Sequence, residues 1–127
     1  MARILIIDDD PEILRVLRRV LESRGHTVLE AGDGATALRH FAGDPTDLVL
    51  TDIFMPQMDG IELIMRVKEA FPEARVLAMS GGGRLPMSNV LGAASMLGAE
   101  EVLAKPFTAA EVLAAVERAL AGPTSPP

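Results

Sequence analysis

Near its start the chain has the sequence Ile-Leu-Ile-Ile-Asp-Asp-Asp at residues 4–10, four apolar residues followed by three acids. The apolar part is short, mostly β-branched and uninterrupted, which is typical of a strand buried on both faces. Such strands occur in parallel sheets that helices cover on both sides. The stretch therefore predicts an inner strand at residues 4–7, with acidic residues at its carboxyl end.

Downstream, apolar runs of strand length alternate with segments of helical period. Further strands are predicted at residues 27–31, 48–51, 75–79 and 102–104. Helices are predicted from Pro11 to a turn at Gly25, at residues 33–41, 61–71 and 90–97, and from Thr108 to about residue 120. Three helix starts carry capping residues, because Asp10 and Asp33 suit the N-cap and Thr108-x-x-Glu111 has the spacing of a capping box.

This alternation predicts an α/β domain with a five-stranded parallel sheet, doubly wound, over residues 1–121. An antiparallel α+β fold is the alternative. Residues 122–127, Gly-Pro-Thr-Ser-Pro-Pro, have the composition of a disordered tail or the start of a linker. The chain is thus expected to be a free-standing domain or one unit of a longer protein.

Composition excludes several classes of function. The net charge is −6, which disfavours binding to a nucleic-acid backbone. The chain has no Cys, Trp or Tyr, so thiolate metal sites are excluded and aromatic stacking on bases or flavins is disfavoured. No apolar run approaches the roughly 20 residues of a membrane span, and the start lacks the pattern of a secretory leader. A cytoplasmic protein with no membrane or nucleic-acid partner is expected.

The residues that follow the predicted strands carry the candidate chemistry. Parallel strands end along one edge of a sheet, so the side chains after four of these strands should meet there. They are Asp8, Asp9, Asp52, Ser80 and Lys105. Clustered carboxylates without Cys favour a hard cation such as Mg²⁺, and a carboxylate beside such a cation can accept a phosphoryl group.

Lysine usage supports the choice of Lys105. The chain has ten Arg and only two Lys, and one of the two stands at a strand end, before Pro106. A slim ammonium group enters a pocket that a planar guanidinium does not fit. The other lysine, Lys68, is expected to be a solvated surface charge. Asp10 is interpreted as a helix cap and not as a ligand.

These motifs resemble the receiver domains of two-component response regulators over nearly the whole chain. The matching segments are residues 4–10, Leu50-Thr51-Asp52-Ile53-Phe54-Met55-Pro56, Met58-Asp59-Gly60, Ser80 and Lys105-Pro106-Phe107. The resemblance implies a flavodoxin-like fold with strand order 2-1-3-4-5, an order that is known for this family. It also implies a cis peptide bond between Lys105 and Pro106.

The resemblance further implies a role for each site residue. Asp52 would take a phosphoryl group from the phosphohistidine of a histidine kinase or phosphotransfer protein. Asp9, Asp52 and the backbone carbonyl of Phe54 would ligate Mg²⁺ directly, and Asp8 would hold the ion through water. Lys105 would pair with the phosphoryl oxygens. Ser80 would hydrogen-bond the phosphoryl group and move the adjacent surface, so the protein is expected to be a switch and not an enzyme that turns over a separate substrate.

Three features depart from the usual family pattern. The switch hydroxyl is Ser80 where Thr is commoner, and Val102 replaces an aromatic residue three positions before Lys105. The segment from Ser80 to Lys105 is about three residues longer than usual, and the extra residues are expected at 81–84. These changes leave phosphorylation as expected but indicate a different readout of the signal.

Three other functions compete with this interpretation. A pseudo-receiver scaffold would be expected to lack Asp52 or Lys105, and both are present. A haloacid dehalogenase phosphatase needs a second acid two residues after its nucleophile, where this chain has Phe54. A flavin carrier needs a hydroxyl-rich loop after the first strand, where this chain has three Asp. The sequence identifies neither the cognate kinase nor the downstream protein target.

Overall fold

The computed structural model describes residues 2–53, 60–80 and 98–121 of the 127-residue chain. The strands are β1 (Arg3–Ile7), β2 (Thr27–Ala31), β3 (Leu48–Asp52), β4 (Arg75–Ser80) and β5 (Glu101–Ala104). The helices are α1 (Pro11–Glu22), α2 (Gly34–Gly43), α3 (Gly60–Ala70) and α5 (Ala109–Ala121). The predicted helix at residues 90–97, the loop at 81–84 and the tail at 122–127 lie outside the described residues.

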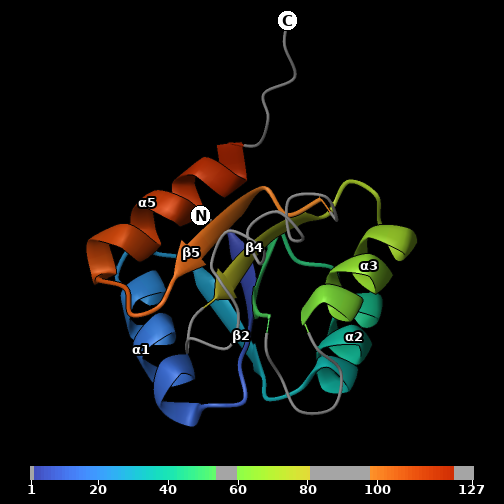
Figure 1. The fold of residues 1–127 in the computed structure, drawn as a ribbon, viewed down its shortest axis with the longest axis horizontal. Coiled ribbons are helices and arrows are strands. Elements are labelled where there is room, and N and C mark those ends of the chain that lie inside the picture. The colour runs from blue at the N-terminus through green and yellow to red at the C-terminus, as the bar shows by residue number, and fades with distance from the viewer. Residues whose placement is uncertain (1, 54–59, 81–97, 122–127) are drawn as a thin grey trace, which may run out of the picture.

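All five strands pair in parallel, in the order β2-β1-β3-β4-β5. The predicted doubly wound sheet is therefore confirmed, and the antiparallel alternative is wrong. Figure 1 shows α1 and α5 on one face of the sheet and α2 and α3 on the other. Strand order reverses direction between β1 and β3, which is where ligand sites form in such sheets.

Alternate residues of each inner strand enter two separate cores. Ile4 and Ile6 pack with α1 and α5, whereas Leu5 and Ile7 pack with α2 and α3. Successive strand side chains point to opposite faces, so an uninterrupted apolar strand supplies both cores at once. This is why the run at residues 4–7 contains no polar residue.

The predicted caps are present at all three helix starts. The Asp10 carboxylate accepts from the Glu12 amide at 2.9 Å, and the Asp33 carboxylate accepts from the Thr36 amide at 2.7 Å. The Thr108 hydroxyl accepts from the Glu111 amide at 3.1 Å, while the Glu111 carboxylate accepts from the Thr108 amide at 2.8 Å. This reciprocal pair is the capping box that the sequence predicted.

Strand β2 has the predicted bounds, and the boundaries of the other elements differ from the predictions by at most three residues. Helix α1 ends at Glu22, and Gly25 lies in the following turn with φ of 84°, a conformation that favours glycine. Strand β3 continues one residue further than predicted, so that Asp52 is its last residue. Strand β4 likewise extends to Ser80.

The expectation that Lys68 is a solvated surface charge is wrong. Its side chain is only 20% exposed, and its ammonium group pairs with the Glu100 carboxylate at 3.3 Å. The same group donates to the Ala74 carbonyl oxygen. Glu100 is 32 positions away in the chain, so local sequence gave no sign of this partner.

Within the described ranges, no helix combines the length and the hydropathy needed to cross a bilayer.

Candidate functional site

The carboxyl ends of β1, β3 and β5 bring their acidic and basic residues to one edge of the sheet. Asp8 follows the last residue of β1, Asp52 is the last residue of β3, and Lys105 follows the last residue of β5. β1 and β3 are neighbours, with Ile7 opposite Thr51, so Asp8 and Asp52 both stand one position beyond this pair. The sheet topology thus places the two carboxylates side by side.

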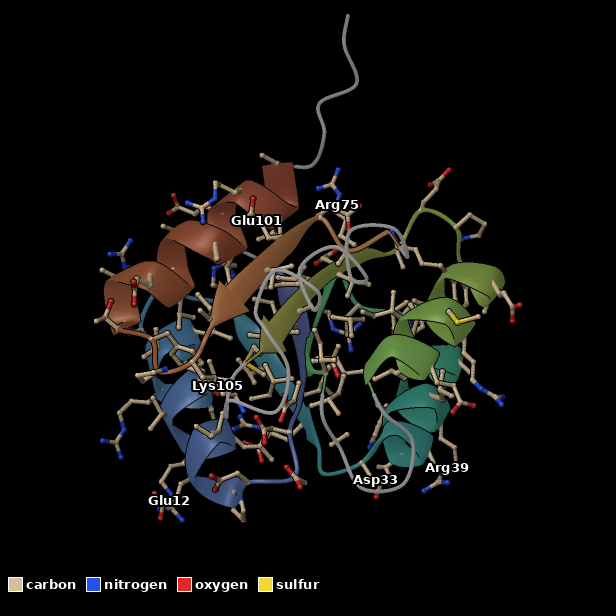
Figure 2. The ribbon with its side chains drawn as sticks, in the orientation of Figure 1. Glu12, Asp33, Arg39, Arg75, Glu101 and Lys105 are labelled. Atoms are coloured by element: carbon tan, nitrogen blue, oxygen red, sulfur yellow. The ribbon has the colours of Figure 1, made fainter. Side chains whose placement is uncertain are left out.

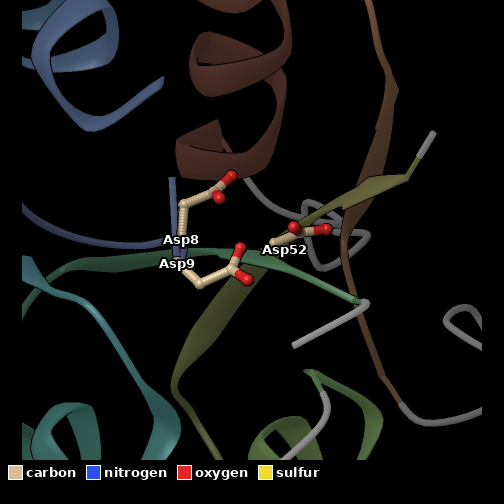
Figure 3. A group of neighbouring side chains, drawn as sticks. All are labelled: Asp8, Asp9 and Asp52. Atoms are coloured by element: carbon tan, nitrogen blue, oxygen red, sulfur yellow. The ribbon is translucent and has the colours of Figure 1, made fainter. Parts of the chain in front are cut away.

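Three carboxylates converge at this edge. Asp8, Asp9 and Asp52 each offer one oxygen atom, and these oxygens all lie within 4.8 Å of one another (Figure 3). Asp8 is 1% exposed and Asp52 is 6% exposed, whereas Asp9 is exposed. The cluster is therefore buried on the side of β1 and β3 and accessible to solvent on the side of Asp9.

Lys105, labelled in Figure 2, follows the end of β5, and its ammonium group pairs with both Asp8 and Asp52. Its Nζ donates to Oδ2 of Asp8 at 2.9 Å and to Oδ2 of Asp52 at 3.2 Å. The peptide bond between Lys105 and Pro106 is cis, as the resemblance implied. One cation therefore faces a buried pair of carboxylates.

Burial and pairing set the electrostatics of the site. Burial raises the pKa of Asp8, and the nearby charge of Asp52 adds to this, although hydrogen bonds from Lys105 and from the Asp10 amide oppose it. Burial by itself would lower the pKa of Lys105, but the hydrogen bond to Asp8 and the charges of Asp52 and Asp8 outweigh it, so that its pKa is raised. Lys105 is therefore a fixed positive charge at neutral pH.

The donor set fits a hard divalent cation. Carboxylate oxygens are the ligands that Mg²⁺ prefers, and three carboxylates converge here. The exposed Asp9 leaves one side open, where water can complete the coordination. Asp8, Asp9 and Asp52 could hold such an ion; the Phe54 carbonyl, also expected as a ligand, lies outside the described residues.

Ser80 is placed by its backbone. It ends β4 and lies opposite Ala104, the residue before Lys105. The expected switch residue therefore stands at the same edge of the sheet as the acids, and its role remains a prediction.

Two polar contacts around the acids had no role in the sequence analysis. The Thr51 hydroxyl is buried and donates to the Asp52 carbonyl oxygen at 3.0 Å. The Asp10 amide donates to Oδ1 of Asp8 at 2.9 Å. A hydroxyl in an otherwise apolar strand, directly before the candidate acid, was the available sign of the first contact.

Known proteins resemble this chain in sequence and structure. A family model described as "Response regulator receiver domain" matches residues 4–117. The "Response regulator receiver protein CpdR" of Brucella abortus is 34% identical over 94% of this chain and 98% of its own length. The "DNA-binding transcriptional regulator NtrC" of Azospirillum brasilense is 39% identical over 98% of this chain.

Solved structures agree with these matches. A receiver domain protein of Clostridium thermocellum is 33% identical, covers 94% of each chain and superposes with a TM-score of 0.86. The chain spans only 25% of the NtrC relative, and about half of several other curated relatives that it matches.

Proposed function

This chain belongs to the response regulator receiver domain family, and from that premise we propose that Asp52 accepts a phosphoryl group from the phosphohistidine of a histidine kinase or phosphotransfer protein. Receiver domains are signalling modules of two-component systems, so the acidic edge would be the point where this chain receives its signal. The observation that carries the proposal is the contact of Lys105 with both Asp52 and Asp8.

The transfer is a substitution at phosphorus. An Oδ atom of Asp52 attacks the phosphorus atom, a P–O bond forms as the P–N bond to the imidazole breaks, and the released imidazole takes up a proton. Asp52 suits this role because it is an acceptor-only carboxylate held at the end of a rigid strand. Its burial limits the water that competes with the donor.

The neighbouring residues have complementary roles in the proposal. Lys105 already touches Asp52 and would turn toward the phosphoryl oxygens once they are attached. Asp8, Asp9, Asp52 and the Phe54 carbonyl would hold Mg²⁺, which when bound neutralises charge on the transferred group. Ser80 would hydrogen-bond the phosphoryl group and so couple it to the end of β4.

The proposed receiver unit covers residues 1–121. Its end is supported by α5, which finishes at Ala121. Residues 122–127 would be a tail or the start of a linker.

Phosphorylation by a small donor tests the assignment of Asp52. Acetyl phosphate with Mg²⁺ should add one phosphoryl group, detected as a single mass increment that is lost at alkaline pH. Asp52→Asn should abolish the increment, because an amide is a poor nucleophile. Asp47→Asn is the matched control. Asp47 is an exposed acid directly before β3, and its carboxylate accepts from the Arg3 amide. Equal labelling of Asp52→Asn and the wild type would refute the proposal.

A further inference from the structure

Lys68, the lysine that is not part of the acidic site, forms a partly buried ion pair at the other end of β5. Lys68 Nζ lies 3.3 Å and 3.5 Å from the two carboxylate oxygens of Glu100. The two side chains are 20% and 15% exposed. Among the ion pairs of the described residues, those that Lys105 makes are comparably buried. Arg18 and Glu30 form a pair that is more exposed, with side chains 38% and 35% exposed. Each of the remaining pairs has at least one side chain that is 49% exposed or more. The two side chains of Lys68 and Glu100 are partly buried, so this pair is more than a solvated surface contact.

Glu100 holds the backbone of β4 with both its main chain and its side chain. Its amide donates to the Val76 carbonyl at 2.8 Å, and its Oε1 accepts from the Val76 amide at 2.8 Å. These bonds lie directly before the first residue pair of the β4–β5 ladder, Leu77 with Glu101. Glu100 thus fixes where β5 begins along β4.

The ammonium group of Lys68 holds this carboxylate in place. Lys68 projects from the last turn of α3 and also donates to the carbonyl of Ala74, the residue before β4. Its stem passes Gly98, where an added Cβ would lie 3.2 Å from the lysine Cε. Gly98 also has φ of 101°, so a side chain there would be strained as well as crowded. The lysine side chain therefore has room here because residue 98 is a glycine.

Strand β5 is short, so a contact at its start can set its position along β4. It has four residues and, among the described strands, it lies at the edge of the sheet and pairs with β4 alone. Leu103 is its one buried side chain. A displacement of an edge strand along its neighbour moves every residue that follows. The first residue that follows β5 is Lys105.

We propose that Lys68 and Glu100 are positioning residues that fix the register of β5 and thereby place the Lys105 ammonium group on Asp52 and Asp8. Figure 2 shows Glu101, next to this pair, and Lys105 at opposite ends of β5. Loss of the contact between Glu100 and Val76 would therefore displace Lys105, because the short strand β5 connects the two positions. The effect on phosphorylation rests on the proposed function, whereas the effect on the location of Lys105 does not.

Three variants separate the pair from its surroundings. Lys68→Met keeps the apolar stem but removes the charge, leaving the half-buried Glu100 carboxylate without its cation, so that it turns to solvent and releases Val76. Glu100→Ala removes the carboxylate that accepts from the Val76 amide and leaves only the main-chain hydrogen bond to the Val76 carbonyl. The double variant Lys68→Met/Glu100→Gln leaves no charge at the position of this pair. The introduced amide oxygen can still accept from the Val76 amide. This variant should therefore recover the placement of Lys105.

Two controls match these variants. Arg118→Met removes the other ion pair of β5, between Arg118 and Glu101, in which the arginine is 59% exposed. Leu21→Ala lowers the stability through the α1 core, on a helix that does not carry this pair. All proteins are compared at a temperature at which each remains folded by circular dichroism.

The first measurement is the ¹³Cε and ¹⁵Nζ chemical shift of Lys105 in metal-free protein without a phosphodonor. The chain has two lysines, so Lys68→Met leaves the Lys105 signal alone in the spectrum. Lys68→Met and Glu100→Ala should shift this signal, whereas the double variant and both controls should leave it near the wild-type position. The second measurement is the phosphorylation rate with a small donor and Mg²⁺, which should fall about tenfold in the two single variants, since a misplacement of about 1 Å can cost about a hundredfold.

An unmoved Lys105 signal in both single variants, or an unchanged phosphorylation rate, would overturn the proposal. So would an equal response of Arg118→Met or Leu21→Ala, because general destabilisation would then suffice. Failure of the proposed function would give a different result, because Asp52→Asn would then still be labelled. The Lys105 chemical shift would still test the positioning role in that case.

Discussion

The ammonium nitrogen of Lys105 lies 3.2 Å from Oδ2 of Asp52, although the two residues are 53 positions apart in the chain. The same nitrogen lies 2.9 Å from Oδ2 of Asp8, which is 97 positions away. One cation therefore connects the ends of β1, β3 and β5. A phosphoryl group attached to Asp52 would meet this cation without any rearrangement of the strands.

Replacing Lys105 should impair phosphorylation without preventing folding. Lys105→Met removes the positive charge that faces the transferred group, and loss of one such electrostatic contact costs about a hundredfold or more in rate. Lys105→Arg should restore little, because a planar guanidinium does not fit the position of a slim ammonium group. Mass spectrometry over time with acetyl phosphate and Mg²⁺ measures the rates, and Arg118→Met is the control. Lys105→Met at the wild-type rate would contradict the role given to this residue.

Mg²⁺ should stabilise the folded chain. The unfolded chain has no assembled carboxylate cluster, so at a concentration of ten times Kd the ion should add about 1.4 kcal/mol to the free energy of unfolding. Asp9→Ala should remove this response and raise the stability of the metal-free protein, because it relieves repulsion among three neighbouring carboxylates.

Urea denaturation with and without Mg²⁺ measures both effects. Glu117→Gln, on the exposed side of α5, is the matched loss of one acid and should keep the Mg²⁺ response. A wild-type unfolding curve that millimolar Mg²⁺ does not shift would count against the metal site.

The N-cap of α2 should contribute a pH-dependent part of the stability. Hydrogen bonds from the Thr36 amide and hydroxyl lower the pKa of Asp33 below its ordinary value of 3.8. A carboxyl whose pKa is lowered by folding stabilises the protein above its unfolded pKa, and this contribution is lost as the pH falls through the folded pKa. Asp33→Asn keeps a capping oxygen but does not titrate.

The free energies of unfolding of the wild type and Asp33→Asn should therefore differ by a constant amount above about pH 5 and by progressively less below about pH 4. Chemical denaturation at a series of pH values provides the comparison. Curves that stay parallel down to about pH 2.5 would show that folding does not lower the pKa of Asp33.

Phosphorylation should be read out elsewhere than at Val102. Val102 lies opposite Ala78 and packs against the core on the α2 and α3 face, and its β-branched side chain has little rotamer freedom. The segment after Ser80 begins with Gly81, Gly82 and Gly83, which are conformationally permissive. Amide chemical shifts with beryllofluoride and Mg²⁺ should therefore change most, outside the acidic edge, at residues 81–97. Changes centred instead on Val102 and α5 would contradict this prediction.

Most of the fold was predictable because its determinants are local. The run at residues 4–7 predicted a doubly covered strand, and the spacing of Thr108 and Glu111 predicted the start of α5. Both depend on residues a few positions apart, and periodicity in a short window records which side chains face the core. The acids of the site were predictable for a related reason, since each directly follows or ends a recognisable strand and parallel strands share one edge.

Tertiary structure alone determined the degree of burial and the partners of the charged groups. Lys68 illustrates this, because its helix is amphipathic and gave no sign that its ammonium group would meet Glu100 and the Ala74 carbonyl. The burial that raises the pKa of Asp8 likewise depends on how the strands and helices pack around it. A hydrophobic pattern specifies which face of an element is buried, but the free energy of a charge depends on the distance to groups remote in the chain, and only the packed sheet sets those distances.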